Sequence, residues 1–484
     1  GSMHPARLLN SATKIINTIA RPARCLLVTI CAVCSGLTLH AFGQPNLLLI
    51  YVDDLGLGDL SHTGHPVIKT PNLDSLAQTG LTLSNYYAPS ALCSPSRAGL
   101  LTGRQPYRTG IQSWIPADSG VYLRDDEITL AELLNDAGYQ TALIGKWHLN
   151  SDLGSKLEPQ PNDQGFAYFY GHNAFQIPTN KNPINLYRNR QALPMQQGYT
   201  AQLYADEAID WLNRRNNTQP FFLMLSMAEP HTSIENPPEY NALYEQYTRG
   251  PIVPITSGGD HIPKSALNPR GPGEYYANIT YMDSQIGRVL DKIDQADLRS
   301  NTIVVFTSDN GPVTEQWINW YEVNAYGSTN GLKGRKHFLS DGGLKVPAII
   351  RYPGVLPAGE TSNALVIGTD WFSTLLNYSA VPVPRDRPID SLNIGPVLAG
   401  EKIQQERTLH WALPTPDGFD YAIRKGNWKL MLTQQHEAVA LYHLGQDPLE
   451  LFNVLKDFPV KLAELKKQHQ KNLESIAADP FRPQ

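Results

Sequence analysis

Short apolar runs alternate with segments of helical periodicity along this chain, and no other feature constrains its fold as strongly. The first run, Leu47–Val52, is apolar throughout, which is typical of a parallel strand buried on both faces. Further strands are predicted at Thr141–Ile144, Phe221–Met227, Ile303–Thr307 and Ala348–Arg351. Helices are predicted around them, within Thr70–Gly80 and at Thr129–Ala137, Thr200–Arg214, Gly273–Ile293 and Asp370–Tyr378. We therefore expect an α/β fold with a large, mainly parallel sheet sandwiched by helices.

The pattern changes after a proline-rich stretch at Pro382–Pro388. Four short strands and a closing helix are predicted beyond it, at Arg407–Ala412, Tyr421–Arg424, Trp428–Thr433, Ala438–Leu444 and Pro459–Ile476. Gly426 and Asn427 suit a hairpin turn between the second and third of these strands. We expect a main α/β domain over residues 44–400 and a smaller C-terminal antiparallel α+β subdomain over residues 401–484.

Residues 1–43 are expected to be absent from the mature fold. Gly1 and Ser2 look like an expression scar, and basic residues then lead into an apolar run, Cys25–Phe42. This arrangement is typical of a secretory leader. A transmembrane anchor is the alternative, but the run is near the lower length limit for a span and contains polar side chains. We expect an exported bacterial protein, periplasmic or secreted, with no stable membrane span after leader removal.

Charge and cysteine content narrow the possible partners. Lys and Arg number 40 against 45 Asp and Glu, a net charge of −5, which is not the balance of a nucleic-acid binder. Cys25, Cys31 and Cys34 lie in the leader, so the mature chain keeps only Cys93 and cannot form a disulfide framework. A lone cysteine is by default a small buried hydrophobic residue, so its context decides whether it has a chemical role.

Acidic residues follow two predicted strands at their carboxyl ends. Asp53 and Asp54 follow the first strand, and Asp309 and Asn310 follow Ile303–Thr307. Ligands of open α/β sheets bind beyond these ends. Three carboxylates and an amide form an all-oxygen set that suits a hard divalent cation, Ca²⁺ before Mg²⁺. Either pair alone would be read as turn residues, but two pairs at equivalent places predict a metal site.

The segment CSPSR, Cys93–Arg97, leads into a short predicted helix that Gly103 can end. Cys93 would lie at the helix N-terminus, where free N–H groups and the helix dipole favour an anion and lower a thiol pKa. Arg97 and Arg104 would add fixed positive charges suited to a tetrahedral oxyanion. The alternative is a helix cap flanked by surface arginines.

Lysines and histidines occupy comparable places elsewhere. Lys146 and His148, in the motif GKWH, are two residues apart after a predicted strand, so in an extended chain their side chains face the same way. His231 follows another strand in the motif EPH, and Lys336 lies in the glycine-containing segment GLKGRKHF. A lone histidine is more often a core residue. Together, however, these residues predict two acid/base groups and two fixed cations around one anion.

These motifs resemble those of the type I, formylglycine-dependent sulfatases of the alkaline phosphatase superfamily. The family signature, Cys or Ser, any residue, Pro-Ser-Arg and then Thr-Gly-Arg, stands here as CSPSRAGLLTGR at residues 93–104. Other similar motifs are VDD, GKWH, PH, SDNG and, in the C-terminal part, RKGNWKL and LYHLGQDPLE. The resemblance covers essentially the whole mature chain and implies an alkaline phosphatase-like fold.

The resemblance also implies the cofactors. A formylglycine-generating maturase would oxidise Cys93 to Cα-formylglycine, whose hydrate is the nucleophile. A Ca²⁺ ion would be held by Asp53, Asp54, Asp309 and Asn310.

The other roles follow from the same resemblance. Arg97 and Lys146 would steady the aldehyde hydrate, and Lys336 would bind a sulfate oxygen. His148 would be the base for the elimination of sulfate, and His231 would protonate the leaving alcohol.

The chain departs from the family pattern at two places. Ser233 stands two residues after His231, where the family usually has proline. Asp341 precedes Gly342 and Gly343, where the family usually has glutamate. Neither change removes a reagent that the resemblance implies.

Aromatic residues near these motifs favour a carbohydrate substrate. Trp114 follows the nucleophile segment, and Trp317, Trp320, Tyr321 and Tyr326 follow SDNG. Aromatic faces beside a polar site suit sugar rings, although a hydrophobic plug under a long loop is an equal alternative for any one of them. We expect a sulfated sugar, such as an algal galactan of the carrageenan type, with glycosaminoglycan fragments as the nearest alternative.

Two other functions remain open at this stage. A phosphonate or phosphate monoester hydrolase would share the nucleophile motif and the tetrahedral anion pocket. One Ca²⁺ with Arg97, Lys146 and Lys336 favours the singly charged sulfate monoester. A non-catalytic carbohydrate-binding protein on a sulfatase-like scaffold would be expected to lack some of the catalytic or metal-binding residues. This chain has a suitable residue at every such position that the resemblance implies.

Overall fold

The computed structural model describes residues 43–247, 271–313, 326–403 and 406–483. The predicted leader up to residue 42, with its three cysteines, lies outside these ranges, and so do Trp317, Trp320 and Tyr321. Asn46–Gln484 form one unit, whose fold is described below. Among the described residues, no helix combines the length and apolar character that a membrane span requires.

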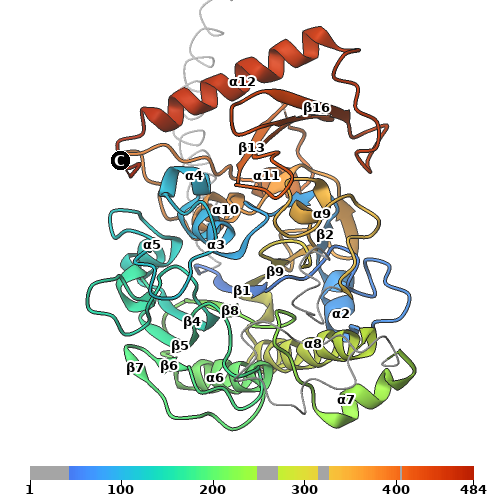
Figure 1. Ribbon diagram of the computed structural model, residues 1–484. Coiled ribbons are helices and arrows are strands. Elements are labelled where there is room, and N and C mark those ends of the chain that lie inside the picture. Colours follow the sequence, from blue (N-terminus) through green and yellow to red (C-terminus); the bar gives the residue numbers. More distant parts are fainter. Residues whose placement is uncertain (1–42, 248–270, 314–325, 404–405, 484) are drawn as a thin grey trace, which may run out of the picture. The chain divides into compact units, whose positions relative to one another are not determined.

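A large sheet lies at the centre of this unit (Figure 1). Its strands are β1 (Asn46–Val52), β2 (Leu81–Leu83), β4 (Gln140–Lys146), β5 (Tyr168–His172), β6 (Tyr187–Arg188), β7 (Gln191–Ala192), β8 (Phe221–Ser226), β9 (Thr302–Ser308), β10 (Ala348–Arg351) and β11 (Glu360–Ser362). Within the described residues these ten strands have the order β11-β2-β10-β9-β1-β8-β4-β5-β6-β7. The five from β9 to β5 are mutually parallel, which confirms the predicted mainly parallel sheet. β3 (Tyr86–Tyr87) and β12 (Val366–Ile367) pair separately.

The predicted strand Ala348–Arg351 is present as β10, but it runs antiparallel to both β9 and β2. A parallel strand would need a crossover that returns the chain to the opposite end of the sheet. Here Ala348 lies opposite Thr307, so β10 begins at the end where β9 stops. The described part of the connection includes one short helix, α9 (Asp341–Leu344). The antiparallel direction therefore keeps this connection at the carboxyl end of β9.

Helices cover both faces of the sheet, as expected (Figure 1). One face carries α2 (Pro71–Thr79), α6 (Thr200–Arg214), α8 (Pro272–Gln295) and, against α8, α7 (Pro238–Leu243). The other face carries α3 (Cys93–Thr102), α4 (Pro106–Thr109), α5 (Leu130–Asp136), α10 (Asp370–Tyr378) and α11 (Gly395–Leu398). Short 3₁₀ helices lie at Pro161–Gln164, Glu245–Tyr247 and Arg299–Asn301.

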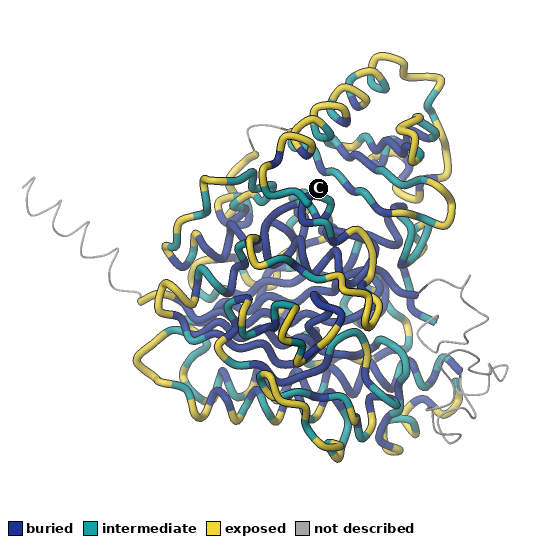
Figure 2. The backbone as a smooth tube through the Cα atoms, turned by 60° about the vertical axis from the view of Figure 1, so that its left-hand side comes forward, coloured by how far each residue is buried: buried dark blue, intermediate teal, exposed yellow. Residues whose placement is uncertain are grey.

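The side chains of β1 explain why this strand is apolar throughout. Leu47, Leu49 and Tyr51 pack in the same core as α3, α5 and α10, whereas the alternate residues Leu48 and Ile50 pack with α2, α6 and α8. Successive side chains of a strand point to opposite faces, and both faces are covered here. Figure 2 shows the central strands buried, with the exposed residues in outer turns and helix surfaces.

Four further strands form a separate antiparallel sheet, as predicted for the C-terminal part. They are β13 (Thr408–Ala412), β14 (Tyr421–Lys425), β15 (Trp428–Leu432) and β16 (Ala438–His443), in that order, and α12 (Pro459–Ala477) closes the chain. Gly426 has a φ of +54° in the predicted hairpin turn. Trp411 Nε1 donates a hydrogen bond to the carbonyl of Ala88, 3.0 Å away, which connects β13 to the segment before α3. The domain boundary near residue 400 stays a prediction.

A close strand approach at Gly145 gives a test of the fold. Gly145 in β4 has a φ of +119°, and a Cβ there would lie 1.7 Å from the carbonyl oxygen of Ser226 in β8. We expect Gly145→Ala to lower the free energy of unfolding by more than about 3 kcal/mol, measured by urea denaturation. Gly138→Ala is the matched control, because Gly138 has a φ of +94° but a Cβ added there would meet no atom of the described residues within 4 Å. Its loss should be about 1 kcal/mol, from backbone strain alone. Equal losses would contradict the steric argument.

Candidate active site

The side chains predicted to bind metal lie together at the carboxyl ends of two adjacent strands. Asp53 and Asp54 follow β1, and Asp309 and Asn310 follow β9, which pairs with β1 in parallel. The backbone N–H of Asp54 donates to Asp309 Oδ1 (3.1 Å), and Asn310 Nδ2 donates to Asp54 Oδ1 (2.7 Å). All four residues are buried. The structure therefore brings the two predicted pairs together.

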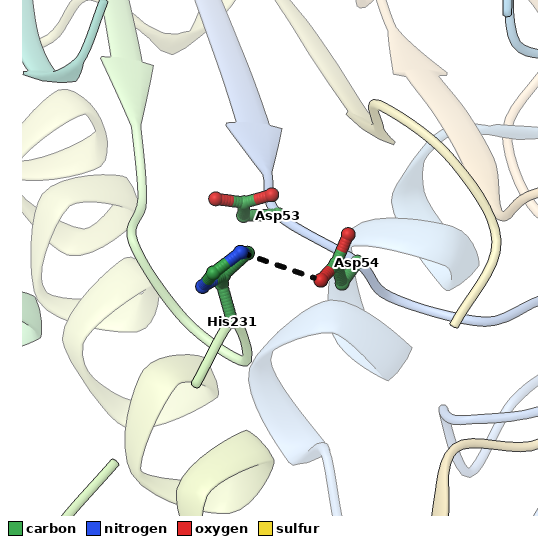
Figure 3. A group of neighbouring side chains, drawn as sticks. All are labelled: Asp53, Asp54 and His231. Carbon is green, nitrogen blue, oxygen red and sulfur yellow. Dashed lines mark ion pairs between the residues drawn. The ribbon is translucent and has the colours of Figure 1, made fainter. Parts of the chain in front are cut away.

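Two buried oxygens in this group have the character of cation ligands. Asp53 Oδ1 and Asn310 Oδ1 have no hydrogen-bond partner among the described residues. Ligand atoms of Asp53, Asp54 and His231 lie within 4.8 Å of one another (Figure 3). Buried acceptor oxygens without donors are costly unless a cation or a donor meets them. The residues present therefore fit a hard divalent cation of the Ca²⁺ type.

Cations accompany these carboxylates. Lys146, the last residue of β4, places Nζ 2.6 Å from Asp53 Oδ2. Arg97 of α3 lies 2.9 Å from Asp309 Oδ2 and also donates to Ser226 Oγ (2.8 Å) at the end of β8. Burial and the neighbouring Asp53 raise the pKa of Asp309 to about 7, although Arg97 opposes this shift. The protein thus holds negative charge at this centre only with cations in direct contact.

Lys336 completes the charged group from a third direction. Its Nζ lies 2.8 Å from Asp54 Oδ1, and its backbone N–H donates to the carbonyl of Pro312 (2.9 Å). Burial alone would raise the pKa of Asp54, but Lys336 and then His231 hold it below its usual value. Lys336 is only 6% exposed, so its charge is little screened by solvent.

Cys93 begins α3, as the sequence predicted, and Gly103 ends the helix in a left-handed conformation. The thiol is 3% exposed and interacts electrostatically with Lys146, Lys336 and the acidic residues, so it belongs to the same centre. The expectation of a lowered thiol pKa is wrong: burial raises the pKa of Cys93, and the two lysines only reduce that rise. Desolvation of the buried thiolate is the largest effect on this pKa, and it outweighs the opposing effect of the two lysines.

The two predicted histidines differ in their surroundings. His148 is 2% exposed, and its Nε2 lies 2.9 Å from the carbonyl of Ile115. Because a carbonyl only accepts, Nε2 carries the proton, and Nδ1 is a buried basic nitrogen with no partner in the described part of the chain. Burial, and then Lys146, lower the pKa of His148 well below its ordinary value.

His231 approaches the candidate metal position from the segment after β8. Its Nε2 lies 3.8 Å from Asp54 Oδ2, as the dashed line in Figure 3 marks. Burial lowers the pKa of His231 to about 3, although Asp54 opposes the shift. Both predicted histidines therefore lie at the centre, and both are neutral near pH 7 in this state.

Two residues that position this centre were not predicted from the sequence. Ser226 orients Arg97, and its only sequence signal is a hydroxyl at the end of an otherwise apolar strand. Glu229 is buried and accepts from Thr200 Oγ1 (2.5 Å) and the backbone N–H of Ala201 (3.1 Å) at the start of α6. Glu229 thereby fixes the segment that carries His231, and the EPH motif was its signal.

The structure corrects the expectation for Arg104. This arginine is fully buried, with Nε 3.0 Å from Glu127 Oε2 and NH1 3.0 Å from Asp479 Oδ2. It therefore ties α3 to the C-terminal end of the chain and does not contribute a charge to the anion site. Spacing alone could not separate it from Arg97, because Glu127 and Asp479 are distant in the sequence.

A buried centre in which cations lie beside a candidate metal position suits the hydrolysis of a tetrahedral oxyanion ester. Comparison with known proteins identifies the ester. The family model described as Sulfatase matches residues 45–380, and the model described as N-sulphoglucosamine sulphohydrolase, C-terminal, matches residues 334–479. The chain belongs to the sulfatase family, whose enzymes hydrolyse sulfate esters.

Individual relatives extend over most of the chain. Human steryl-sulfatase is 30% identical over 443 residues, which cover 75% of this chain and 71% of that protein. An N-acetylgalactosamine-6-O-sulfatase of Bacteroides thetaiotaomicron is 28% identical, covering 87% of this chain and 92% of that protein. A crystal structure of Ps i-CgsB in complex with k-i-k-neocarrahexaose has a TM-score of 0.74 and 26% identity, covering 88% of this chain and 92% of that chain.

The two arginines of the signature make a testable pair. Arg104→Met removes the buried cation that Glu127 and Asp479 share. Each carboxylate then keeps only its second partner, Arg124 at 3.6 Å and Arg108 at 3.2 Å, so we expect a loss of about 3 kcal/mol in the free energy of unfolding. The kcat of the remaining folded enzyme should stay within about twofold of wild type. Arg97→Met should instead reduce sulfate release by at least about a hundredfold. Denaturant unfolding and sulfate detection measure the two effects. A large kcat loss in a well-folded Arg104→Met variant would restore the original interpretation.

Proposed function

We propose that this protein removes sulfate from a sulfated carbohydrate by means of a Cα-formylglycine hydrate made from Cys93, with a Ca²⁺ ion as cofactor. The ion would be held by Asp53, Asp54, Asp309 and Asn310. The observation that supports the proposal most is that Cys93 lies among buried cations and carboxylates contributed by separate strands.

The cofactors would supply the chemistry that ordinary side chains lack. Bound Ca²⁺ would polarise the nucleophile and a sulfate oxygen. A formylglycine hydrate offers one hydroxyl for attack and a second for the release of sulfate, which a thiol cannot do. Arg97 and Lys146 would orient this hydrate, and Lys336 would contact a sulfate oxygen and offset its charge.

His148 and His231 would move the protons. The neutral Nδ1 of His148 can accept a proton from the hydrate during the release of sulfate. His231 would donate a proton to the leaving alcohol. The pKa of His231 is lowered mainly by burial, and a bound sulfate ester would add negative charge that raises it toward the range of a useful acid.

A carbohydrate substrate is supported by the aromatic residue beside the base. Trp114 is 43% exposed, and its ring centroid lies 6.5 Å from that of His148. The next residue, Ile115, donates from its N–H to Ser94 Oγ (3.1 Å) and accepts from His148, so the position of Trp114 is fixed relative to both. Such a face suits a sugar ring next to the sulfate. An algal galactan of the carrageenan type is our first choice, with glycosaminoglycan fragments second.

We also propose that the protein is exported to the periplasm or secreted, and that a formylglycine-generating maturase acts on it. The leader-like residues 1–43 support export. Burial of Cys93 with the whole of α3 means that the maturase would have to reach the thiol before the helix packs.

Replacement of the nucleophile tests the function directly. Cys93→Ala should abolish sulfate release from sulfated oligosaccharides, by more than about a thousandfold, while calorimetry still detects binding of the saccharide. The mass of the peptide that contains residue 93 distinguishes the aldehyde from the thiol in the wild-type protein. Full activity in Cys93→Ala would refute the nucleophile assignment. Faster hydrolysis of phosphate or phosphonate esters by the wild type would favour the alternative hydrolase.

The substrate class can be tested at Trp114. Trp114→Ala should lower kcat/KM for a sulfated oligosaccharide by about tenfold, because a stacking face is lost. Hydrolysis of a small aryl sulfate, which has no sugar to stack, should change by less than about twofold. Phe452→Ala, which removes a 69% exposed aromatic residue of the C-terminal part, is the control and should leave both rates unchanged. Equal losses on both substrates would argue against a sugar subsite at Trp114.

A further inference from the structure

A buried cation of the C-terminal sheet reaches the loop that carries Lys336. Lys429 of β15 is fully buried, and its Nζ lies 2.8 Å from Asp341 Oδ1 and 2.7 Å from Glu450 Oε1. Glu450 Oε2 accepts from the backbone N–H of Asp341 (2.7 Å), and Asp341 Oδ2 accepts from the hydroxyl of Tyr87 (2.8 Å). One ammonium group thus pairs with two carboxylates, which also interact electrostatically with Lys345, and it connects segments that are far apart in the sequence.

Asp341 begins α9, and the backbone of this short helix is bonded to the loop that carries the metal-binding residues. The N–H of Gly311, next to Asn310, donates to the carbonyl of Gly343 (3.0 Å). A Cβ at Gly311 would lie 2.1 Å from the carbonyl oxygen of Gly342. The two backbones are therefore in direct contact, with no side chain between them to absorb a shift of α9.

α9 also contacts the two remaining segments of the centre. The N–H of Gly342 donates to the carbonyl of Lys333 (2.8 Å), three residues before Lys336. The N–H of Ala88 donates to the carbonyl of Leu344 (2.7 Å), in the stretch that leads to Cys93. The Nζ of Lys333 itself donates to the carbonyl of Glu450 (3.1 Å).

We propose that Lys429 is a positioning residue for sulfate binding: by pairing with Asp341 and Glu450 it holds α9, and through α9 it sets the positions of Lys336 and Asn310. The proposal rests on the function proposed above, in which Lys336 contacts a sulfate oxygen. Without the ammonium group, two carboxylates would face each other in a buried site, and they would separate or take up water. Either response moves α9.

The test uses inorganic sulfate as a competitive probe of the anion site, together with kcat and KM for a sulfated substrate. Lys429→Met keeps most of the length of the unbranched side chain and removes its charge. We expect the inhibition constant of sulfate to rise by about tenfold and kcat/KM to fall by about ten- to a hundredfold, since small displacements of binding groups have effects of this size. Most of the loss should be in KM, because Lys336 contacts the anion in the bound substrate as well.

Arg407→Met is the matched control. Arg407, whose side chain is 14% exposed, pairs with the buried carboxylate of Asp370, at 2.6 Å and 3.0 Å, at the same boundary between the C-terminal sheet and the main domain. Among the described residues, the hydrogen bonds of this pair go to Leu365, Ile367 and Leu392 and none goes to α9. We expect both Arg407→Met and Lys429→Met to lower the melting temperature. Arg407→Met, however, should leave the inhibition constant of sulfate within about twofold of wild type.

The outcomes separate the two proposals. If wild-type enzyme neither releases sulfate nor is inhibited by it, the proposed function fails. If wild type behaves as proposed while Lys429→Met loses only stability, as Arg407→Met does, the positioning role is overturned. Should Lys429→Met not fold, Glu450→Gln weakens the same group more gently, and we expect about a threefold rise in the inhibition constant; an unchanged constant in that folded variant also overturns the role.

Discussion

The site depends on the pairing of buried opposite charges at the carboxyl ends of the central strands. A single buried carboxylate or ammonium group would cost several kcal/mol in desolvation. Here Asp53 faces Lys146 and Asp309 faces Arg97, and the partners come from β1, β4, β9 and α3. The charges are therefore stable only when the parallel strands are in register. The same condition that stabilises the site also assembles it, because no single segment contains both members of a pair.

The central fold could be predicted well because the sequence patterns that mark its strands and helices are local. α6 and α10 have the predicted bounds, Thr200–Arg214 and Asp370–Tyr378, and β1 differs from its prediction by one residue. Burial on both faces produces an uninterrupted apolar strand, and periodicity marks the helices. Peripheral strands such as β6 and β11 were not predicted. They are two and three residues long and largely exposed, so their pairing depends on neighbours that the local sequence does not specify.

The candidate site was predicted by residue type but not by environment. Motif and strand-end position together identified the residues that lie at the centre, including Cys93 and His148. The predicted lowering of the Cys93 thiol pKa was wrong, because a position at a helix N-terminus does not reveal how far the thiol is buried. The prediction that Arg104 adds a charge to the anion site was wrong for a related reason. Its partners are Glu127 and Asp479, and charge pairing between distant segments has no local sequence pattern.

The two departures from the family pattern become understandable in terms of which atoms the fold uses. Ser233 contacts its neighbours through its backbone carbonyl, which accepts hydrogen bonds from the N–H of Asn180 (3.0 Å) and from Gln176 Nε2 (3.1 Å). These bonds require no particular side chain at that position. At Asp341 the carboxylate faces Lys429, so the acidic residue before the two glycines supports the loop and is not one of the reacting groups. The aspartate at this position therefore contacts the C-terminal sheet, and every group proposed to touch the sulfate is kept.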